Sequence, residues 1–183
     1  MTRRFVVLPL LAVLAGCAGS DDEVARPCPD ITVLADAAAM TRFAPGAGQD
    51  LTDVEFEAQI TDVLSRCDYS GDPEDHDLAV LVALTPVITA SRGPANTGQV
   101  ATLDYFVSVV DQSKTVLNKQ QFSMDIVFPE NRSRVVVRDE DPLVTVQIPL
   151  QTVGSAGAYR LYVGLQLSEA ELDYSRRRSG SVK

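Results

Sequence analysis

Apolar and polar residues alternate strictly along several stretches of this chain, and this alternation limits what the chain can fold into more than any other feature. In residues 53–60 every second side chain is apolar: Val54, Phe56, Ala58 and Ile60. In residues 115–128 the same period places large apolar side chains on one side: Phe122, Met124, Ile126 and Phe128. Because successive side chains of a β-strand point to opposite faces, we expect two strands, each with one buried and one solvated face.

Six further segments have the composition of strands: residues 31–34, 78–84, 103–110, 134–138, 144–148 and 159–167. Residues 78–84 are apolar at every position, which is typical of a central strand covered on both faces. Residues 35–44 fit neither a strand nor a helix clearly. Clusters of turn-forming residues separate the strands about every ten residues. This spacing predicts an all-β fold, an antiparallel β-sandwich of about seven to eight strands.

The period changes near the C-terminus, where a short helix is expected over residues 169–178. Ser168 is followed three residues later by Glu171, which is the pattern of a capping box at a helix start. Glu169 and Glu171 complement the positive end of the helix dipole, and the three arginines at 176–178 complement its negative end. The same arginines could instead contact lipid phosphate or an acidic partner.

The spacing of strands and turns resembles the immunoglobulin and fibronectin type III domains. The chain contains no Trp, so the buried tryptophan of antibody-type domains is missing. The resemblance therefore concerns architecture, and architecture alone does not determine function.

The N-terminal residues have the pattern of a secretory signal. Arg3 and Arg4 precede an apolar run from Phe5 to Leu14, which is too short to span a bilayer that needs about 20 residues. The ending Leu14-Ala15-Gly16-Cys17 resembles the lipobox of bacterial lipoproteins. This resemblance implies a signal peptide at residues 1–16, acyl chains such as palmitate on Cys17, and a lipidated tether at residues 17–27. Residues 28–183 would then form the β domain with its C-terminal helix.

The net charge of the mature chain limits the classes of partner that it can bind. Removal of residues 1–16 takes away two arginines and no acid, which leaves 14 basic and 25 acidic side chains and a formal charge of −11. Such a surface repels nucleic acid and anionic headgroups. We therefore expect no nucleic-acid binding, and membrane attachment through the acyl chains.

With Cys17 acylated, the remaining cysteines are an even pair in an oxidising compartment, so Cys28 and Cys67 are expected to form a disulfide. The bridge would close a loop of about 40 residues and stabilise the fold by roughly 4 kcal/mol in the chain-entropy model. The alternative is two free buried thiols. A zinc site is not expected, because two thiols and one histidine do not supply four ligands.

No segment has the pattern of a catalytic site. The only histidine, His76, lies among Asp72, Glu74, Asp75 and Asp77, a composition that fits an exposed acidic hairpin better than a general base or a calcium site. Residues 45–52 contain glycines but lack the lysine and the following helix of a phosphate loop. No Gly-x-Ser-x-Gly elbow occurs.

These observations predict a non-enzymatic envelope lipoprotein without cofactors or metal, which binds or scaffolds another envelope component. Ala18 after the lipidated cysteine points, by the sorting rule of such lipoproteins, to the periplasmic side of the outer membrane. The alternative is a periplasmic domain that binds a small molecule or calcium. A partner-binding domain predicts an exposed apolar patch or an unpaired edge strand, whereas a ligand-binding domain predicts a concave pocket with convergent polar groups.

Overall fold

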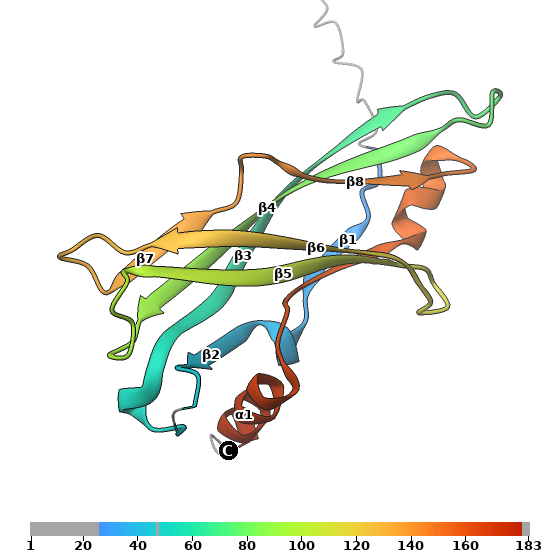
Figure 1. The fold of residues 1–183 in the computed structure, drawn as a ribbon. Coiled ribbons are helices and arrows are strands. Elements are labelled where there is room, and N and C mark those ends of the chain that lie inside the picture. Colours follow the sequence, from blue (N-terminus) through green and yellow to red (C-terminus); the bar gives the residue numbers. More distant parts are fainter. Residues whose placement is uncertain (1–25, 47, 181–183) are drawn as a thin grey trace, which may run out of the picture.

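The computed structural model describes residues 26–46 and 48–180, and these residues form two β-sheets and one short helix (Figure 1). The four-stranded sheet contains β1 (Asp30–Val33), β9 (Arg160–Leu165), β5 (Val100–Val110) and β6 (Val116–Val127), in that order. The five-stranded sheet runs β2 (Ala39–Phe43), β3 (Val54–Ser70), β4 (Ala79–Arg92) and β7 (Arg134–Arg138), and β8 (Val144–Pro149) also pairs with β4. The predominantly β fold and the C-terminal helix are therefore confirmed.

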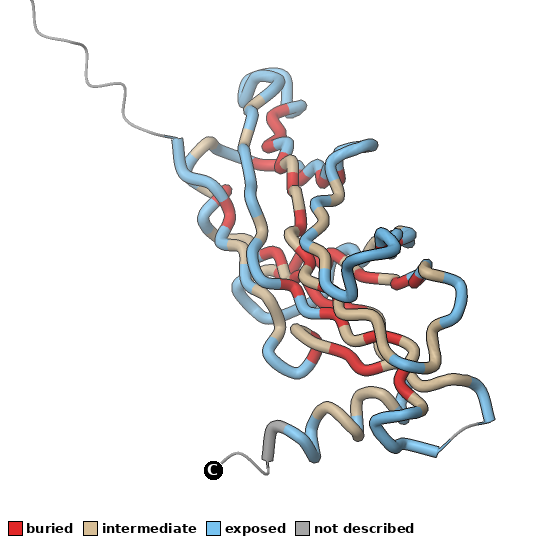
Figure 2. Tube along the Cα trace, turned by 90° about the vertical axis from the view of Figure 1, so that its left-hand side faces the viewer, coloured by how far each residue is buried: buried red, intermediate tan, exposed pale blue. Residues whose placement is uncertain are grey.

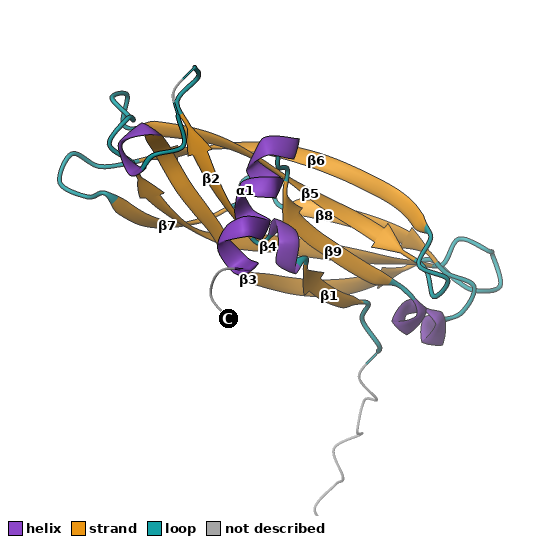
Figure 3. Ribbon diagram, turned by 90° about the horizontal axis from the view of Figure 1, so that it is seen from below, coloured by secondary structure: helices purple, strands orange, loops and turns teal. Residues whose placement is uncertain are grey.

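Three short 3-10 helices and α1 (Glu169–Gly180) complete the described structure (Figure 3). The 3-10 helices are η1 (Ala35–Ala37), η2 (Leu51–Asp53) and η3 (Val153–Ala158). The predicted capping box forms at the start of α1, where the Ser168 backbone N–H donates to the Glu171 carboxylate at 2.8 Å and the Glu171 N–H donates to the Ser168 hydroxyl at 3.3 Å.

The long β3–β4 hairpin runs diagonally across Figure 1 and contributes to one core shared by both sheets. The core includes Phe56 and Ile88 from the five-stranded sheet and Leu103, Tyr105 and Leu161 from the four-stranded sheet. Buried residues gather along the strands, whereas the hairpin loops are exposed (Figure 2). In residues 54–60 of β3 and residues 122–128 the apolar side faces the core, as the alternation of these segments predicts.

The prediction of seven to eight antiparallel strands was wrong in two respects. The described residues contain nine strands, because the ambiguous segment 35–44 forms η1 and the edge strand β2. In addition, β1 pairs with β9 in parallel, with Ile31 opposite Leu161. Since β1 and β9 lie near opposite ends of the sequence, the whole intervening domain serves as the crossover that a parallel pair requires.

The expectation for residues 78–84 also needs correction. Their strand is central, since it lies between β3 and β8, but its outer face is not covered: Leu81 is 36% exposed. The strand is also longer than predicted and continues through Pro86 to Arg92. β8 pairs with residues 79–84 and β7 with residues 87–91, so Pro86 lies between the two partner strands. The Pro86 carbonyl still accepts from the Asp139 N–H at 3.2 Å, but Pro86 has no N–H to donate in return, so the β7 ladder ends at this gap.

Candidate functional site

β6 forms a long unpaired edge of the four-stranded sheet. Among the described residues it pairs only with β5. The Phe128 N–H donates to the Gln99 carbonyl at 2.8 Å. Because bonded pairs alternate along an antiparallel ladder, even-numbered residues of β6 direct their backbone groups to β5. The N–H and C=O groups of the odd-numbered residues therefore point outward: Lys119, Gln121, Ser123 and Asp125.

The inner face of β6 is apolar and only partly covered. Phe122 and Met124 pack against the core, yet both keep some exposure. The Phe122 ring stacks on Tyr105, with ring centroids 5.3 Å apart. The Tyr105 hydroxyl donates to the Asp139 carboxylate, and burial together with this bond raises the pKa of Tyr105 well above its usual value. The buried Tyr105 thus holds the Phe122 ring at the open edge.

The outer face of β6 is polar and ordered by contacts with neighbouring strands. The Lys119 ammonium lies 4.1 Å from the Phe106 ring centroid and donates to the Gln166 amide oxygen at 3.1 Å. The Thr102 hydroxyl donates to the Asp125 carboxylate at 2.6 Å. Within residues 26–46 and 48–180, neither Lys119 nor Asp125 takes part in an ion pair.

Exposed apolar residues lie at both ends of β6. Val116 and Leu117 are 57% and 53% exposed at one end, and Val127 is 64% exposed at the other. Proteins commonly protect an edge strand from pairing by keeping it short or by placing a proline in it. β6 has neither feature.

A groove of about 370 Å³ with a mixed polar and apolar lining lies between α1 and the outer face of the five-stranded sheet. Its sheet side carries Glu57, Gln59, Thr89 and Ser91, which alternate with core residues of β3 and β4. Its remaining polar lining comes from other elements: Thr41, Arg134, Tyr174, Ser175 and Arg178. The Arg178 guanidinium donates to the Glu57 carboxylate across this groove.

The arginines at the end of α1 contact this domain itself. Arg176 pairs with Asp36 at 2.8 Å, Arg177 donates to Gln49 at 3.3 Å, and Arg178 pairs with Glu57. They hold the helix against η1, β2 and β3. This role was not anticipated from the sequence, because the segment that forms β2 and η1 matched no pattern.

The start of α1 is fixed by a third ion pair, between Arg42 and Glu171 at 2.9 Å. The Glu171 side chain is only 12% exposed. Burial alone would raise the pKa of Glu171, but the hydrogen bonds from Ser168 and Arg42 outweigh burial and lower it. Tyr174, one turn further on, contacts Phe43 edge to face at 5.0 Å.

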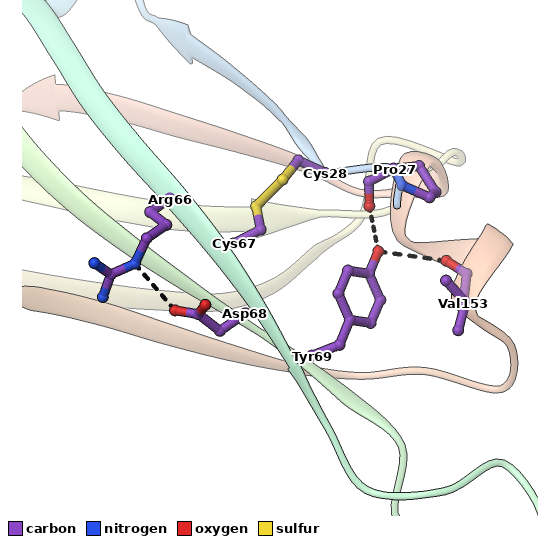
Figure 4. The surroundings of a disulfide bond; sticks show 7 residues. All are labelled: Pro27, Cys28, Arg66, Cys67, Asp68, Tyr69 and Val153. Atoms are coloured by element: carbon purple, nitrogen blue, oxygen red, sulfur yellow. Dashed lines mark hydrogen bonds and ion pairs between the residues drawn. A yellow bond between two sulfur atoms is a disulfide. The ribbon is translucent and has the colours of Figure 1, made fainter. Parts of the chain in front are cut away.

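Of the predicted site residues, Cys28 and Cys67 are joined by a disulfide, with their Cα atoms 6.1 Å apart (Figure 4). Cys17, the signal peptide and residues 17–25 of the predicted tether lie outside the described residues. Beside the bridge, the Tyr69 hydroxyl donates to the carbonyls of Pro27 and Val153. Because Cys28 precedes β1 and Cys67 belongs to β3, the bridge connects the start of the domain to its longest strand.

The loop that contains His76 is an exposed hairpin between β3 and β4. The Asp77 carboxylate accepts from the Asp72 N–H at 2.6 Å, and the Asp72 carboxylate accepts from the Glu74 N–H at 2.9 Å. These carboxylates therefore organise the turn itself. Within the described parts of the chain, no group of three or more His, Cys, Asp or Glu side chains is placed to hold a metal ion.

Comparisons with known proteins find no matching family model, no significantly similar curated protein and no significantly similar solved structure. No helix among the described residues combines the length and apolarity needed to cross a membrane. The two surfaces that stand out are thus the β6 edge and the groove under α1. The sequence predicted β6 as a strand, but nothing in its alternation indicated that the strand lies at an edge.

Proposed function

We propose that this protein is a lipid-anchored lipoprotein of the bacterial envelope, facing the periplasm from the outer membrane, and that it binds or scaffolds another envelope protein without catalysis. In this proposal the two sheets pack as a β-sandwich, and acyl chains on Cys17 hold it at the membrane. The Cys28–Cys67 disulfide supports the proposed location, since such bonds persist in oxidising compartments.

The β6 edge is the observation that carries the proposed binding function. Its outward N–H and C=O groups are the groups that an added strand would pair with. The partly exposed Phe122 and Met124 offer apolar contacts on the inner face of such a strand. Backbone pairing would provide affinity, and these side chains would select the partner.

A photo-crosslinking amino acid at Gln121 in the full-length protein, expressed in intact cells, tests this function. We expect an envelope protein to be captured from the membrane fraction. The same amino acid at Gln147, on β8, serves as the matched control and should give no such product. Equal capture from both positions, or none from Gln121, would refute binding at β6.

A second candidate function, binding of a small polar molecule, is favoured by the groove under α1. Its volume of about 370 Å³ falls in the range of ligand pockets, and hydroxyl, amide, carboxylate and guanidinium groups converge on it. A ligand there should raise the melting temperature of the protein. In a screen of sugars and amino acids, we expect such a rise to disappear in the variant Thr89→Val if this function holds.

A further inference from the structure

We propose that the strand that pairs with β6 is the β6 strand of a second copy of this chain. This inference rests on the proposed function, since it assigns the partner of the same edge. The two copies would be related by a two-fold axis, and their four-stranded sheets would join into one continuous sheet. An interface of this kind is isologous, so β6 must be complementary to itself when it runs antiparallel.

The charges of β6 meet this requirement in one register. When Phe122 lies opposite Phe122 of the second copy, Lys119 lies opposite Asp125 of the second copy. By symmetry, Asp125 then lies opposite the other Lys119, and Gln121 lies opposite Ser123. Both charged residues lack an ion-pair partner within the described part of the chain, and opposite charges directly across an antiparallel pair stabilise it.

The backbone supports the same register. All four facing pairs join odd-numbered residues, whose N–H and C=O groups point away from β5. Each pair can therefore exchange two hydrogen bonds, which gives about eight across the interface. Phe122 then lies at a non-bonded position, where the Cα atoms of facing residues approach most closely.

Apolar residues also match in this register. Leu117, which is 53% exposed at the β-bulge next to Asn118, comes near Val127 of the second copy, which is 64% exposed. On the inner face, Gln120 comes opposite Met124. A shift by two residues would instead place Lys119 opposite Ser123 or Val127 and would separate the apolar ends. A shift by one would turn the inner face of one strand to the outer face of the other.

Charge reversal tests the register in the full-length protein extracted in mild detergent, with the dimer dissociation constant as the measurement. Lys119→Asp and Asp125→Lys should each weaken the dimer about ten-fold, because each replaces two attractive pairs by two repulsive ones. The double variant K119D/D125K restores both pairs and should return the constant to within about three-fold of the wild type. Lys114→Asp, the same charge change in the β5–β6 turn, should have no effect.

Ser123→Pro provides a second test that does not depend on charge. Its N–H points outward, so proline removes a bond of the dimer without removing a bond to β5. We expect a monomer with the far-UV circular dichroism of the wild type. If this variant unfolds, the charge series still decides the matter.

Disulfide trapping in native membranes tests the register of the two β6 strands directly. Two differently tagged copies, one with Lys119→Cys and the other with Asp125→Cys, should crosslink when expressed together. Neither variant should crosslink with itself.

A monomeric wild-type protein, or a double variant as weak as the single ones, would overturn the inference. Capture of a different protein from Gln121, with a monomeric wild type, would overturn the second copy as partner and leave binding at β6 intact. A monomer with no capture at all would overturn both.

Discussion

At the scale of single residues, a few side chains join parts of the fold that are distant in sequence. Tyr69 and Cys67 tie β3 to the residues around Cys28. Glu171 joins the first turn of α1 to Arg42 on β2. Tyr105 crosses the core to Asp139. In the described residues no buried side-chain nitrogen or oxygen lacks a hydrogen-bond partner, so these polar contacts are compatible with burial.

Removal of the disulfide should destabilise the domain without changing its fold. For the variant Cys28→Ser/Cys67→Ser we expect a loss of about 4 kcal/mol in the free energy of unfolding, because the bridge restricts a loop of about 40 residues in the unfolded chain. Urea denaturation followed by circular dichroism measures this loss. Thiol counting on the denatured, unreduced protein is the control, and two reactive thiols besides Cys17 would show that the bridge is absent.

The ion pair between Glu171 and Arg42 should make the docking of α1 depend on pH. Since folding lowers the pKa of Glu171, its contribution is present above the ordinary glutamate pKa of about 4.3 and is lost as the pH falls through the lower folded value. We expect Glu171→Gln, which keeps the capping pattern, to cost about 1 kcal/mol at pH 7. In urea denaturation at pH 7 and pH 2.5, the difference from the wild type should shrink at the lower pH. A constant difference would contradict the assignment.

At the scale of elements, β4 shows how one strand serves two partners. Its even-numbered residues direct their backbone groups to β8 and then to β7, since the Leu78 carbonyl accepts from Leu150 and the Pro86 carbonyl accepts from Asp139. Pro86 lies at the gap between the two ladders, where its missing N–H ends the pairing with β7 and leaves the bonds of residues 79–84 and 87–91 intact. A proline is unfavourable inside a continuous strand, and in β4 it lies at the gap between the partner strands β8 and β7.

Proline should therefore be tolerated at position 86 and not at position 90. Pro86→Ala should change the free energy of unfolding by less than about 1 kcal/mol. Ala90→Pro should lower it by at least about 2 kcal/mol, because Ala90 lies opposite Val135 in the β7 ladder and its N–H is buried. Thermal denaturation of both variants measures the contrast. Equal losses of stability in the two variants would contradict the gap between the β7 and β8 ladders at Pro86.

At the scale of the whole molecule, the core and the partly buried residues packed against it lie between Ile31 and Leu167. The proposed anchor at Cys17 precedes these residues in the sequence and lies outside the described part of the chain. Cys17→Ser should abolish acylation and leave the melting temperature of the domain within about 1 °C of the wild type. Intact-mass spectrometry of the membrane extract should show acyl groups on the wild type alone. If both proteins have the mass of the full unmodified chain, with Met1 retained, lipidation at Cys17 is excluded.

Much of the secondary structure was predictable because it depends on local pattern. The alternation around Phe122 and Met124 identified β6, and the capping box at Ser168 identified α1 to within two residues. The segment of β2 escaped prediction because its burial does not alternate: the neighbouring Met40 and Thr41 are both buried, and Arg42 pairs with Glu171 of α1. Without β2, neither the contacts of the three arginines nor the groove could be foreseen.

The sequence by itself determined where strands and turns lie, which side of each strand is apolar, and that two cysteines were available to pair, because these properties depend on neighbours within a few residues. Only the tertiary structure decided which strands have a single partner, that β1 runs parallel to β9, and that β4 is shared by β7 and β8. An edge strand and an inner strand with one solvated face have the same period of two. The two kinds of strand differ only in whether their backbone N–H and C=O groups are paired on both sides. These groups are the same in every residue except proline, and they acquire partners only when distant segments meet.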